Sequence, residues 1–257
     1  KMGAKYYIIL IIMSIVSKVS AQDSQQIDYI KMSQDFLYAV RTNENAAPYL
    51  DSLATASEDL VAQQLVTDID KKAFFINLYN AYTQYILKQD PNKYKDRNEF
   101  FKSNQILFAS HKVSLDKIEH GFLRHSRVKW SLGYFGKIFP GKLEKKFRVK
   151  KVDYRIHFTL NCGASSCPSI AYYKPEGLDE QLDMATLAYL KGEAEYLEKE
   201  NTLYLPMLMN WFRGDFGGKK NEIKLCKKLG ILPQDAKQKI AFKSYDWQLY
   251  LENYKDN

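Results

Sequence analysis

The residues best suited to chemistry lie in one short segment, Asp153 to Pro168, which reads DYRIHFTLNCGASSCP. It holds His157, Cys162 and Cys167, although the whole chain has only four histidines and three cysteines. Thiols and an imidazole beside a flexible Gly163 turn can form a nucleophilic site, a metal site or a disulfide. The segment narrows the chemistry to these three possibilities and does not indicate a substrate.

In the first interpretation, one cysteine is a nucleophile and a neighbouring imidazole lowers its pKa. The alternating residues from Arg155 to Asn161 predict a half-buried strand. On a regular strand the side chain of Cys162 would point to the opposite face from that of His157. Cys167 lies on the following loop, which can fold back over the strand. We therefore expect Cys167 to be the nucleophile and Cys162 to be the second choice. The amides of Gly163–Ser166 are a candidate oxyanion hole.

The other two interpretations use the same residues differently. A Cys162–Cys167 disulfide would close a tight loop and leave Cys226 unpaired, and an oxidising compartment favours such a bond. Alternatively, both cysteines could bind zinc together with His120 and His157, because these are ligand types that zinc prefers. The spacing is unusual for a zinc site, and all three interpretations stay open.

A second group of polar residues lies in SLDKIEHGFLR, residues 114–124. Ser114 can cap a short helix, on which His120 and Arg124 share a face and Glu119 lies beside them. One hypothesis makes His120 the general base, oriented by Glu119. The plainer alternative is a histidine at the solvent edge with charged neighbours.

KKAFFINLYNAYTQYILK, within residues 70–88, is apolar on nearly every side and predicts a central buried helix. Asn77 and Asn80 lie on one stripe of that helix. Buried amides need hydrogen bonds, so these two either hold neighbouring loops in place or act in the site, where one would orient a catalytic imidazole such as that of His157 or polarise a substrate carbonyl.

The remaining pattern predicts a helix-rich α+β single domain with a small mixed or antiparallel sheet. Residues 129–141 are aromatic and glycine-rich and predict a loop. Helices are expected over 22–42, 57–68, 115–124, 178–200, 207–213 and 220–229, and strands over 106–110, 203–206 and 239–243.

The N-terminal stretch KMGAKYYIILIIMSIVSKVSAQ has the layout of a secretory signal peptide, with cleavage expected after Ala21. Its apolar run is too short for a membrane span of roughly 20 residues. We expect a secreted or periplasmic protein with no membrane span after cleavage. The expected divisions are a signal peptide at 1–21, an N-terminal helical region at 22–69 and a core at 70–257.

The formal net charge is +8, from 38 basic and 30 acidic residues. Lysine clusters at 142–151 and 219–228 are typical of solvated helix faces. No nucleic-acid-binding signature is present, so we expect no nucleic-acid partner, and no motif indicates a cofactor.

Five ordered motifs over residues 70–250 resemble the domain of unknown function 547 family. They are the buried helix, SLDKIEHGFLR, DYRIHFTLNCGASSCPSI, WFRGDFGG and SYDWQL. The resemblance implies an exported bacterial protein without a settled activity. The family's hallmark residues correspond here to Asn77, Asn80, Glu119, His120, Arg124, His157, Cys162, Cys167, Pro168, Asp215 and Phe216.

The sequence therefore favours an exported thiol-dependent hydrolase or acyltransferase with a Cys/His cleft. Arg124 and Arg213 could hold a substrate carboxylate bidentately, with Asp215 beside them. The alternatives are a zinc site, or a non-catalytic module for a peptide, glycan or small molecule. In the module a Cys162–Cys167 disulfide would brace the cleft, and aromatic side chains such as Trp130, Tyr134 and Phe135 would supply contact surface.

Overall fold

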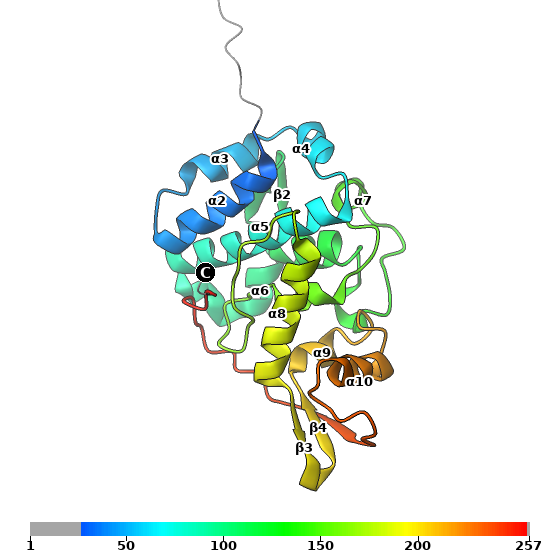
Figure 1. Ribbon diagram of the computed structural model, residues 1–257. Coiled ribbons are helices and arrows are strands. Elements are labelled where there is room, and N and C mark those ends of the chain that lie inside the picture. Colours follow the sequence, from blue (N-terminus) through cyan, green and yellow to red (C-terminus); the bar gives the residue numbers. More distant parts are fainter. Residues whose placement is uncertain (1–26, 256–257) are drawn as a thin grey trace, which may run out of the picture.

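The computed structural model describes residues 27–255, which form a helix-rich α+β domain with two small sheets (Figure 1). This confirms the expected fold class. The predicted signal peptide lies outside the described residues. Within residues 27–255 every helix is too short or too polar to cross a bilayer. The α-helices are α2 (Tyr29–Thr42), α3 (Ala47–Thr55), α4 (Glu58–Gln64), α5 (Asp68–Gln89), α6 (Arg97–Lys102), α7 (Lys142–Phe147), α8 (Leu178–Glu193), α9 (Met207–Trp211) and α10 (Lys219–Lys228).

Five further helical turns connect these elements. A π-helix, η2 (Lys117–Leu123), takes the place of the short helix expected after Ser114. The Lys117 amide, at its first residue, donates to Ser114 Oγ at 3.0 Å. The others are the 3-10 helices η1 (Pro91–Asp96), η3 (Lys129–Ser131), η4 (Tyr154–Phe158) and η5 (Glu198–Glu200).

α5 is the buried central helix that the sequence predicts. A capping box starts it: the Asp70 amide donates to Thr67 Oγ1 at 3.2 Å, and the Thr67 amide donates to Asp70 Oδ2 at 2.8 Å. Every residue from Lys71 to Gln84 is buried, so α5 needs packing partners on all sides. α2 supplies one of them, where Phe36 meets the Tyr82 ring edge-on at 5.1 Å.

α3 lies between the helices expected over 22–42 and 57–68, where the sequence analysis predicts no helix. Pro48 occupies the first turn of α3, where its missing amide proton costs nothing. α4 begins after Ser57, as predicted, and the Ser57 side chain accepts from the Leu60 amide.

Both sheets are short. β1 (Ile106–Phe108) and β2 (His111–Val113) form an antiparallel hairpin. β3 (Glu195–Leu197), β4 (Thr202–Leu205) and β5 (Lys239–Phe242) form a mixed sheet, in which β4 runs antiparallel to β3 and parallel to β5. The helix expected over 178–200 ends at Glu193 because the chain then enters β3. Figure 1 shows the β3–β4 hairpin at the end of the molecule opposite α2 and α3.

The strand expected over Arg155–Asn161 is wrong, since the structure has the 3-10 helix η4 there. The Asp153 side chain caps this turn by accepting from the Arg155 amide at 3.1 Å. His157 and its two neighbours are all buried, which a half-exposed strand would not allow.

Two hydrophobic clusters fill the domain. The larger gathers α2, α5, the first hairpin and η2, and the smaller gathers β4, α9 and α10. Ile156 belongs to the larger cluster and Phe158 to the smaller one. η4 therefore joins the two clusters, with His157 at the junction.

Candidate functional site

A cavity of about 300 Å³ has walls from both clusters. It brings together residues that lie far apart in the sequence, and four of them are predicted site residues. The rest of the wall is mainly aromatic. The titratable side chains on the wall include Asp116, Glu119, His120, His157, Cys162 and Tyr245.

Cys162 and Cys167 face one another at this wall. Both are free thiols, with Sγ atoms 2.7 Å apart, so the disulfide considered above is not formed in the structure. Cys162 lines the cavity, whereas Cys167 is buried and borders a second cavity. Of the two, Cys162 is the thiol that a ligand in the first cavity can reach.

Hydrogen bonds stabilise the Cys162 thiolate. The Cys167 thiol is the main cause and Tyr245 Oη, 3.4 Å from Cys162 Sγ, assists it; together they lower the pKa of Cys162 to about 7 against the effect of burial. Burial and the neighbouring Cys162 raise the pKa of Cys167 well above its ordinary value. The pair therefore keeps its proton on Cys167, and negative charge develops on Cys162.

His157 is oriented by a buried carboxylate. Burial alone would raise the pKa of Asp215, but hydrogen bonds and charge from His157 and Arg124 lower it, so Asp215 is ionised. His157 Nε2 donates to Asp215 Oδ2 at 2.8 Å, and Arg124 Nε donates to the same oxygen at 2.6 Å. The His157 ring also stacks on Phe212, with centroids 3.9 Å apart. Desolvation lowers the pKa of His157, so the ring is neutral and its Nδ1 keeps a lone pair.

His120 is fixed in one tautomer by Arg124. Arg124 Nη1 lies 2.8 Å from His120 Nδ1, and because a guanidinium can only donate, Nδ1 accepts and Nε2 carries the proton. Burial, with Arg124 as the next cause, lowers the pKa of His120 well below its ordinary value. Its buried Nε2 has no hydrogen-bond partner among residues 27–255, and Asp116 Oδ1 lies 3.6 Å away. This geometry favours a hydrogen-bond donor over the general base suggested by the sequence.

Glu119 is a carboxyl group that titrates near neutrality. Its side chain is only 13% exposed, and burial raises its pKa to about 7 although Arg124 opposes the shift. Its Oε1 lies 3.5 Å from His120 Nδ1, a position already occupied by the Arg124 hydrogen bond. Glu119 is therefore placed to give and take protons at neutral pH, and Arg124 rather than Glu119 orients His120.

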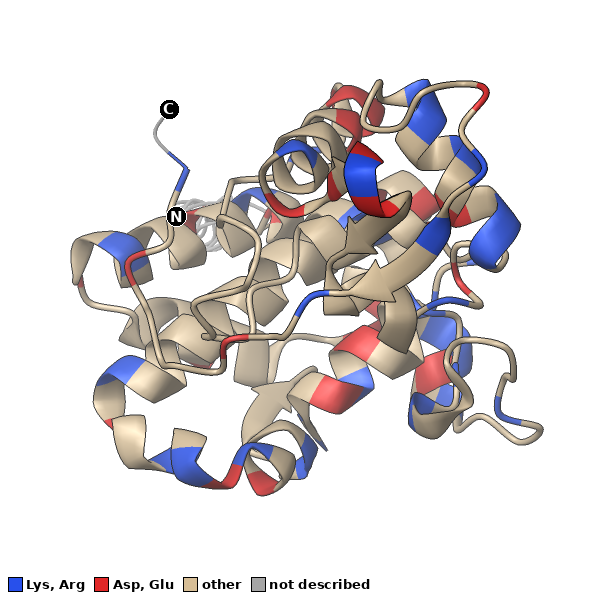
Figure 2. Cartoon of the chain, turned by 90° about the horizontal axis from the view of Figure 1, so that it is seen from below, with Lys and Arg blue, Asp and Glu red and all other residues tan. Residues whose placement is uncertain are grey.

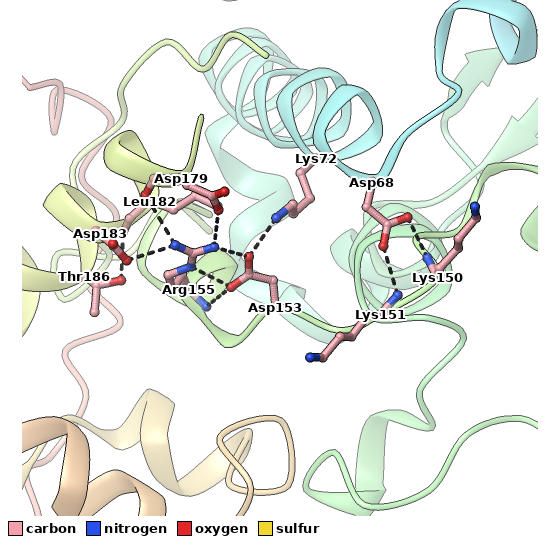
Figure 3. Close-up of polar contacts among 10 residues, drawn as sticks. All are labelled: Asp68, Lys72, Lys150, Lys151, Asp153, Arg155, Asp179, Leu182, Asp183 and Thr186. Atoms are coloured by element: carbon pink, nitrogen blue, oxygen red, sulfur yellow. Dashed lines mark hydrogen bonds and ion pairs between the residues drawn. The ribbon is translucent and has the colours of Figure 1, made fainter. Parts of the chain in front are cut away.

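An ion-pair network holds η4 against α5 and α8. In Figure 3, Arg155 lies between Asp153 and two aspartates of α8, and Lys72 of α5 reaches Asp153. Lys72 Nζ lies 2.7 Å from Asp153 Oδ2, and Arg155 Nη2 lies 2.8 Å from the same oxygen. Arg155 and Lys72 lower the pKa of Asp153 to about 2 although burial opposes them. The network fixes the position of the histidine that η4 carries. The α8 partners are Asp179 and Asp183.

Asn77 and Asn80 hold backbone segments in place, which is the first of the two roles considered for them. Asn77 Nδ2 donates to Tyr173 O at 2.8 Å, and the Tyr173 amide donates back to Asn77 Oδ1 at 2.9 Å. Asn80 Nδ2 donates to Thr159 O at 2.9 Å, and Asn80 Oδ1 accepts from the Asn161 amide at 2.8 Å. Asn80 thus fixes the chain immediately before the site cysteine and does not orient an imidazole.

The three residues expected to bind substrate lie off the cavity wall. The side chains of Arg124 and Asp215 are 0% exposed and pair with each other. Arg213 donates to Asn210 and lies over the Phe242 ring, 5.5 Å from its centroid. The expected carboxylate clamp is therefore wrong, because Arg124 and Asp215 position the histidines instead.

Two titratable residues of the cavity wall, Asp116 and Tyr245, received no role in the sequence analysis. Asp116 lies three and four positions before Glu119 and His120, a spacing that places all three on one helical face. Tyr245 lies in the SYDWQL motif, and its Oη is 3.2 Å from Cys167 Sγ and 3.4 Å from Cys162 Sγ. Helical spacing was a usable signal for Asp116, whereas the phenol's contact with the thiols depends on the tertiary fold.

The loop after Cys162 offers no ready oxyanion hole. The Gly163 amide donates to Asn161 Oδ1 at 2.9 Å, and the amides of Ser165 and Ser166 donate to Gln248 O and Asp246 O. These three donors are satisfied within the protein, and the fourth, the Ala164 amide, is directed at the Cys162 sulfur. The loop therefore does not present the expected set of amides to a substrate oxygen. The unpartnered Nε2–H of the site histidine on η2 is the better candidate.

The zinc hypothesis also fails on geometry. Residues 27–255 contain no group of three or more His, Cys, Asp and Glu side chains arranged to hold a metal ion. The two histidines are engaged by Arg124 and Asp215, and the two cysteines by each other.

Fold and site together define a helix-rich α+β protein with a Cys/His cavity. The family model described as "Protein of unknown function, DUF547" matches residues 63–190, and the chain belongs to that family. This confirms the resemblance seen in the motifs. The matched region contains both site histidines and both site cysteines, whereas Asp215 and Tyr245 lie beyond it. No curated protein and no solved structure matches the chain.

Proposed function

We propose that the protein is a thiol-dependent hydrolase or acyltransferase in which Cys162, rather than Cys167, is the nucleophile. One observation carries the proposal: a thiol with a pKa of about 7 opens onto the same cavity as two neutral, oriented histidines. A thiolate available at neutral pH beside a proton acceptor and a hydrogen-bond donor is what acyl transfer requires.

Each group has a role in the proposed reaction. The Cys162 thiolate attacks the carbonyl carbon of an acyl substrate, and the Nε2–H of His120 donates to the oxygen that gains negative charge. The bond to the leaving group then breaks, the Glu119 carboxyl supplies its proton, and a thioester remains. His157, held by Asp215, accepts a proton from water or from an acceptor alcohol or amine. That nucleophile attacks the thioester and releases the Cys162 thiolate, and the proton passes back to Glu119.

The aromatic wall indicates the kind of substrate. The rings of Trp211 and Trp247 stack with their centroids 5.5 Å apart, and the centroid of the Tyr245 ring lies 4.6 Å from that of Trp247. Such a wall favours an apolar or planar group next to the scissile carbonyl.

The test is hydrolysis of a panel of p-nitrophenyl esters and acyl thioesters of increasing acyl length. We expect Cys162→Ala to abolish turnover and Cys162→Ser to retain only a small fraction of the parent rate. Cys226→Ala, at a buried cysteine outside the cavity, is the matched control and should keep the parent rate. A Cys162→Ala variant that turns over at the full rate would end the proposal.

A second candidate is a non-catalytic binding module for a peptide, glycan or small molecule. The aromatic wall favours it, because stacked rings supply contact area without chemistry. Calorimetric titration with oligosaccharides and peptides distinguishes the two. A module binds equally well with Cys162→Ala, shows no turnover of any acyl substrate and is weakened by Trp247→Ala.

We further propose that the protein is exported to the periplasm or the medium, as the N-terminal pattern indicates. N-terminal sequencing of protein recovered from a fractionated culture tests this. A mature chain beginning at Gln22 is expected, and a cell-retained chain that still carries residues 1–21 would contradict it.

A further inference from the structure

η3 and the loop that follows it expose several large apolar side chains. Phe139 is 92% exposed, Ile138 is 84%, Trp130 is 79% and Phe135 is 63%. Isolated apolar residues are ordinary on protein surfaces, but a contiguous group marks an interaction site. We name these four residues the apolar loop.

The base of this loop is braced, so the exposure does not come from a loose segment. The Val128 amide donates to Phe135 O at 2.9 Å, and the Gly214 amide donates to Leu132 O at 2.7 Å. A Cβ added to Gly214 would lie 2.5 Å from the carbonyl carbon of Gly133, so the loop base and the α9–α10 turn touch backbone to backbone. The fold thus holds the apolar side chains outward.

The positive charge of the chain is concentrated around the same loop. Residues 127–151 contain nine Lys and Arg and one acidic residue, Glu144, which gives a net charge of +8. The whole chain also carries +8, so the remaining residues balance to zero. Figure 2 shows Lys and Arg mixed with Asp and Glu on several elements of the molecule.

Several of these charges are available to a partner. Lys137 pairs with Glu144 at 2.5 Å, but Lys142 and Lys145 at the start and middle of α7 are exposed and form no ion pair within residues 27–255. α7 directly follows the apolar loop in the chain and lies near α4, where Lys146 pairs with Glu58 and Asp59 (Figure 1). Cations therefore lie next to the exposed apolar side chains.

We propose that the apolar loop and α7 dock the protein on an anionic lipid surface. Phe135, Ile138 and Phe139 enter the headgroup–acyl boundary, and Lys142 and Lys145 contact the anionic headgroups. Aromatic and aliphatic side chains flanked by lysines are the combination that binds interfaces peripherally, without a membrane span. A nucleic acid would use the charges but gains nothing from Ile138, which has no ring to stack on a base. The proposal is independent of the chemistry assigned to the cavity.

The test is co-sedimentation of the purified protein with sonicated vesicles. One set contains phosphatidylcholine with about one-third phosphatidylglycerol, and the other contains phosphatidylcholine alone. We expect binding to the anionic set that falls steeply between about 0.1 M and about 1 M salt, with little binding to the neutral set.

Two paired variants separate the apolar and the charged contributions. Ile138→Ser with Phe139→Ser, and separately Lys142→Ser with Lys145→Ser, should each lower the vesicle partition coefficient roughly tenfold or more. The matched controls stand elsewhere on the surface and should bind like the parent. They are Val66→Ser with Leu107→Ser for exposed apolar residues, and Lys220→Ser with Lys224→Ser for exposed lysines.

Three results would overturn the proposal. The first is no binding to anionic vesicles at low salt. The second is binding that the control pairs reduce as much as the test pairs. The third is binding to a polyanion such as RNA in a parallel titration without binding to vesicles, which would assign the surface to nucleic acid.

Discussion

The Sγ atoms of Cys162 and Cys167 lie 2.7 Å apart, with Cys162 on the cavity wall and Cys167 buried behind it. This contact gives two chemically identical side chains different pKa values. One thiol gives up its proton near neutral pH and the other keeps its own.

This difference predicts selective alkylation. Iodoacetamide should modify Cys162 first, at a rate that rises through a pH of about 7 instead of the roughly 8.5 of an ordinary thiol. Cys167→Ala removes the donor and should move this midpoint upward, whereas Cys167→Ser keeps a hydroxyl donor and should move it less. Peptide mass mapping across a pH series measures both.

The third cysteine is an internal control for that experiment. Burial raises the pKa of Cys226 to about 12, so it should stay unmodified in folded protein. Equal labelling of Cys162 and Cys167 at every pH would contradict the proton distribution described here.

Asp215→Asn should be strongly destabilising. It leaves the Arg124 guanidinium buried without a charged partner, and breaking a buried ion pair in this way costs about 3–5 kcal/mol of unfolding free energy. Urea denaturation measures the loss. Asp235→Asn, on the exposed surface, should change stability by less than about 0.5 kcal/mol.

The companion variant Arg124→Met should restore part of the stability lost in Asp215→Asn, because it removes the unpaired charge. If Asp215→Asn alone unfolds with the parent midpoint, the pair does not hold the site together.

Two buried carboxyls should make stability fall as the pH rises. Burial raises the pKa of Glu119 and of Glu222 from 4.5 to about 7, and the Glu222 oxygens have no hydrogen-bond partner among the described residues. Between pH 4.5 and about 7 the folded state therefore binds more protons than the unfolded state, so these groups lower the unfolding free energy across that window.

Glu119→Gln and Glu222→Gln should each flatten this dependence, because a glutamine does not ionise. The measurement is the unfolding free energy at several pH values across the window, relative to the parent. Glu176→Gln, at an exposed position, is the control and should keep the parent slope. Identical slopes in all four proteins would show that neither carboxyl titrates as described.

The opposite sign is expected for Asp153. Its pKa is lowered from 3.8 to about 2, so its contribution is present above pH 3.8 and is lost as the pH falls toward 2. Asp153→Asn should lower the unfolding free energy by about 2 kcal/mol at pH 7, and by progressively less in acid. Thermal unfolding at neutral and acid pH measures this, and a loss that stays constant with pH would count against an ionic origin.

Local patterns predicted the long central elements but missed several short ones, among them α3, α6 and η4. α5 is apolar on every side and carries its own start signal at Thr67 and Asp70, so neighbouring residues suffice to define it. The Arg155 segment alternates like a strand, but its turn is held by Asp179 and Asp183 of α8, whose positions only the tertiary fold decides.

The same distinction holds for the site. The rarity of Cys and His in the chain was enough to find Cys162, His120 and His157. The role of Asp215 was not predictable, because its partners Arg124 and His157 lie 91 and 58 positions away in the sequence.

The position of Asp215 has a consequence for how the chain can be truncated. The matched region ends at residue 190 and contains Cys162 and both site histidines, but the carboxylate that holds His157 directly, and His120 through Arg124, comes from residue 215. A fragment cut at residue 190 would keep the thiols and imidazoles and lose the group that orients them, with Arg124 left charged and unpaired. The domain boundary needed for an intact site therefore lies beyond the boundary of the family match.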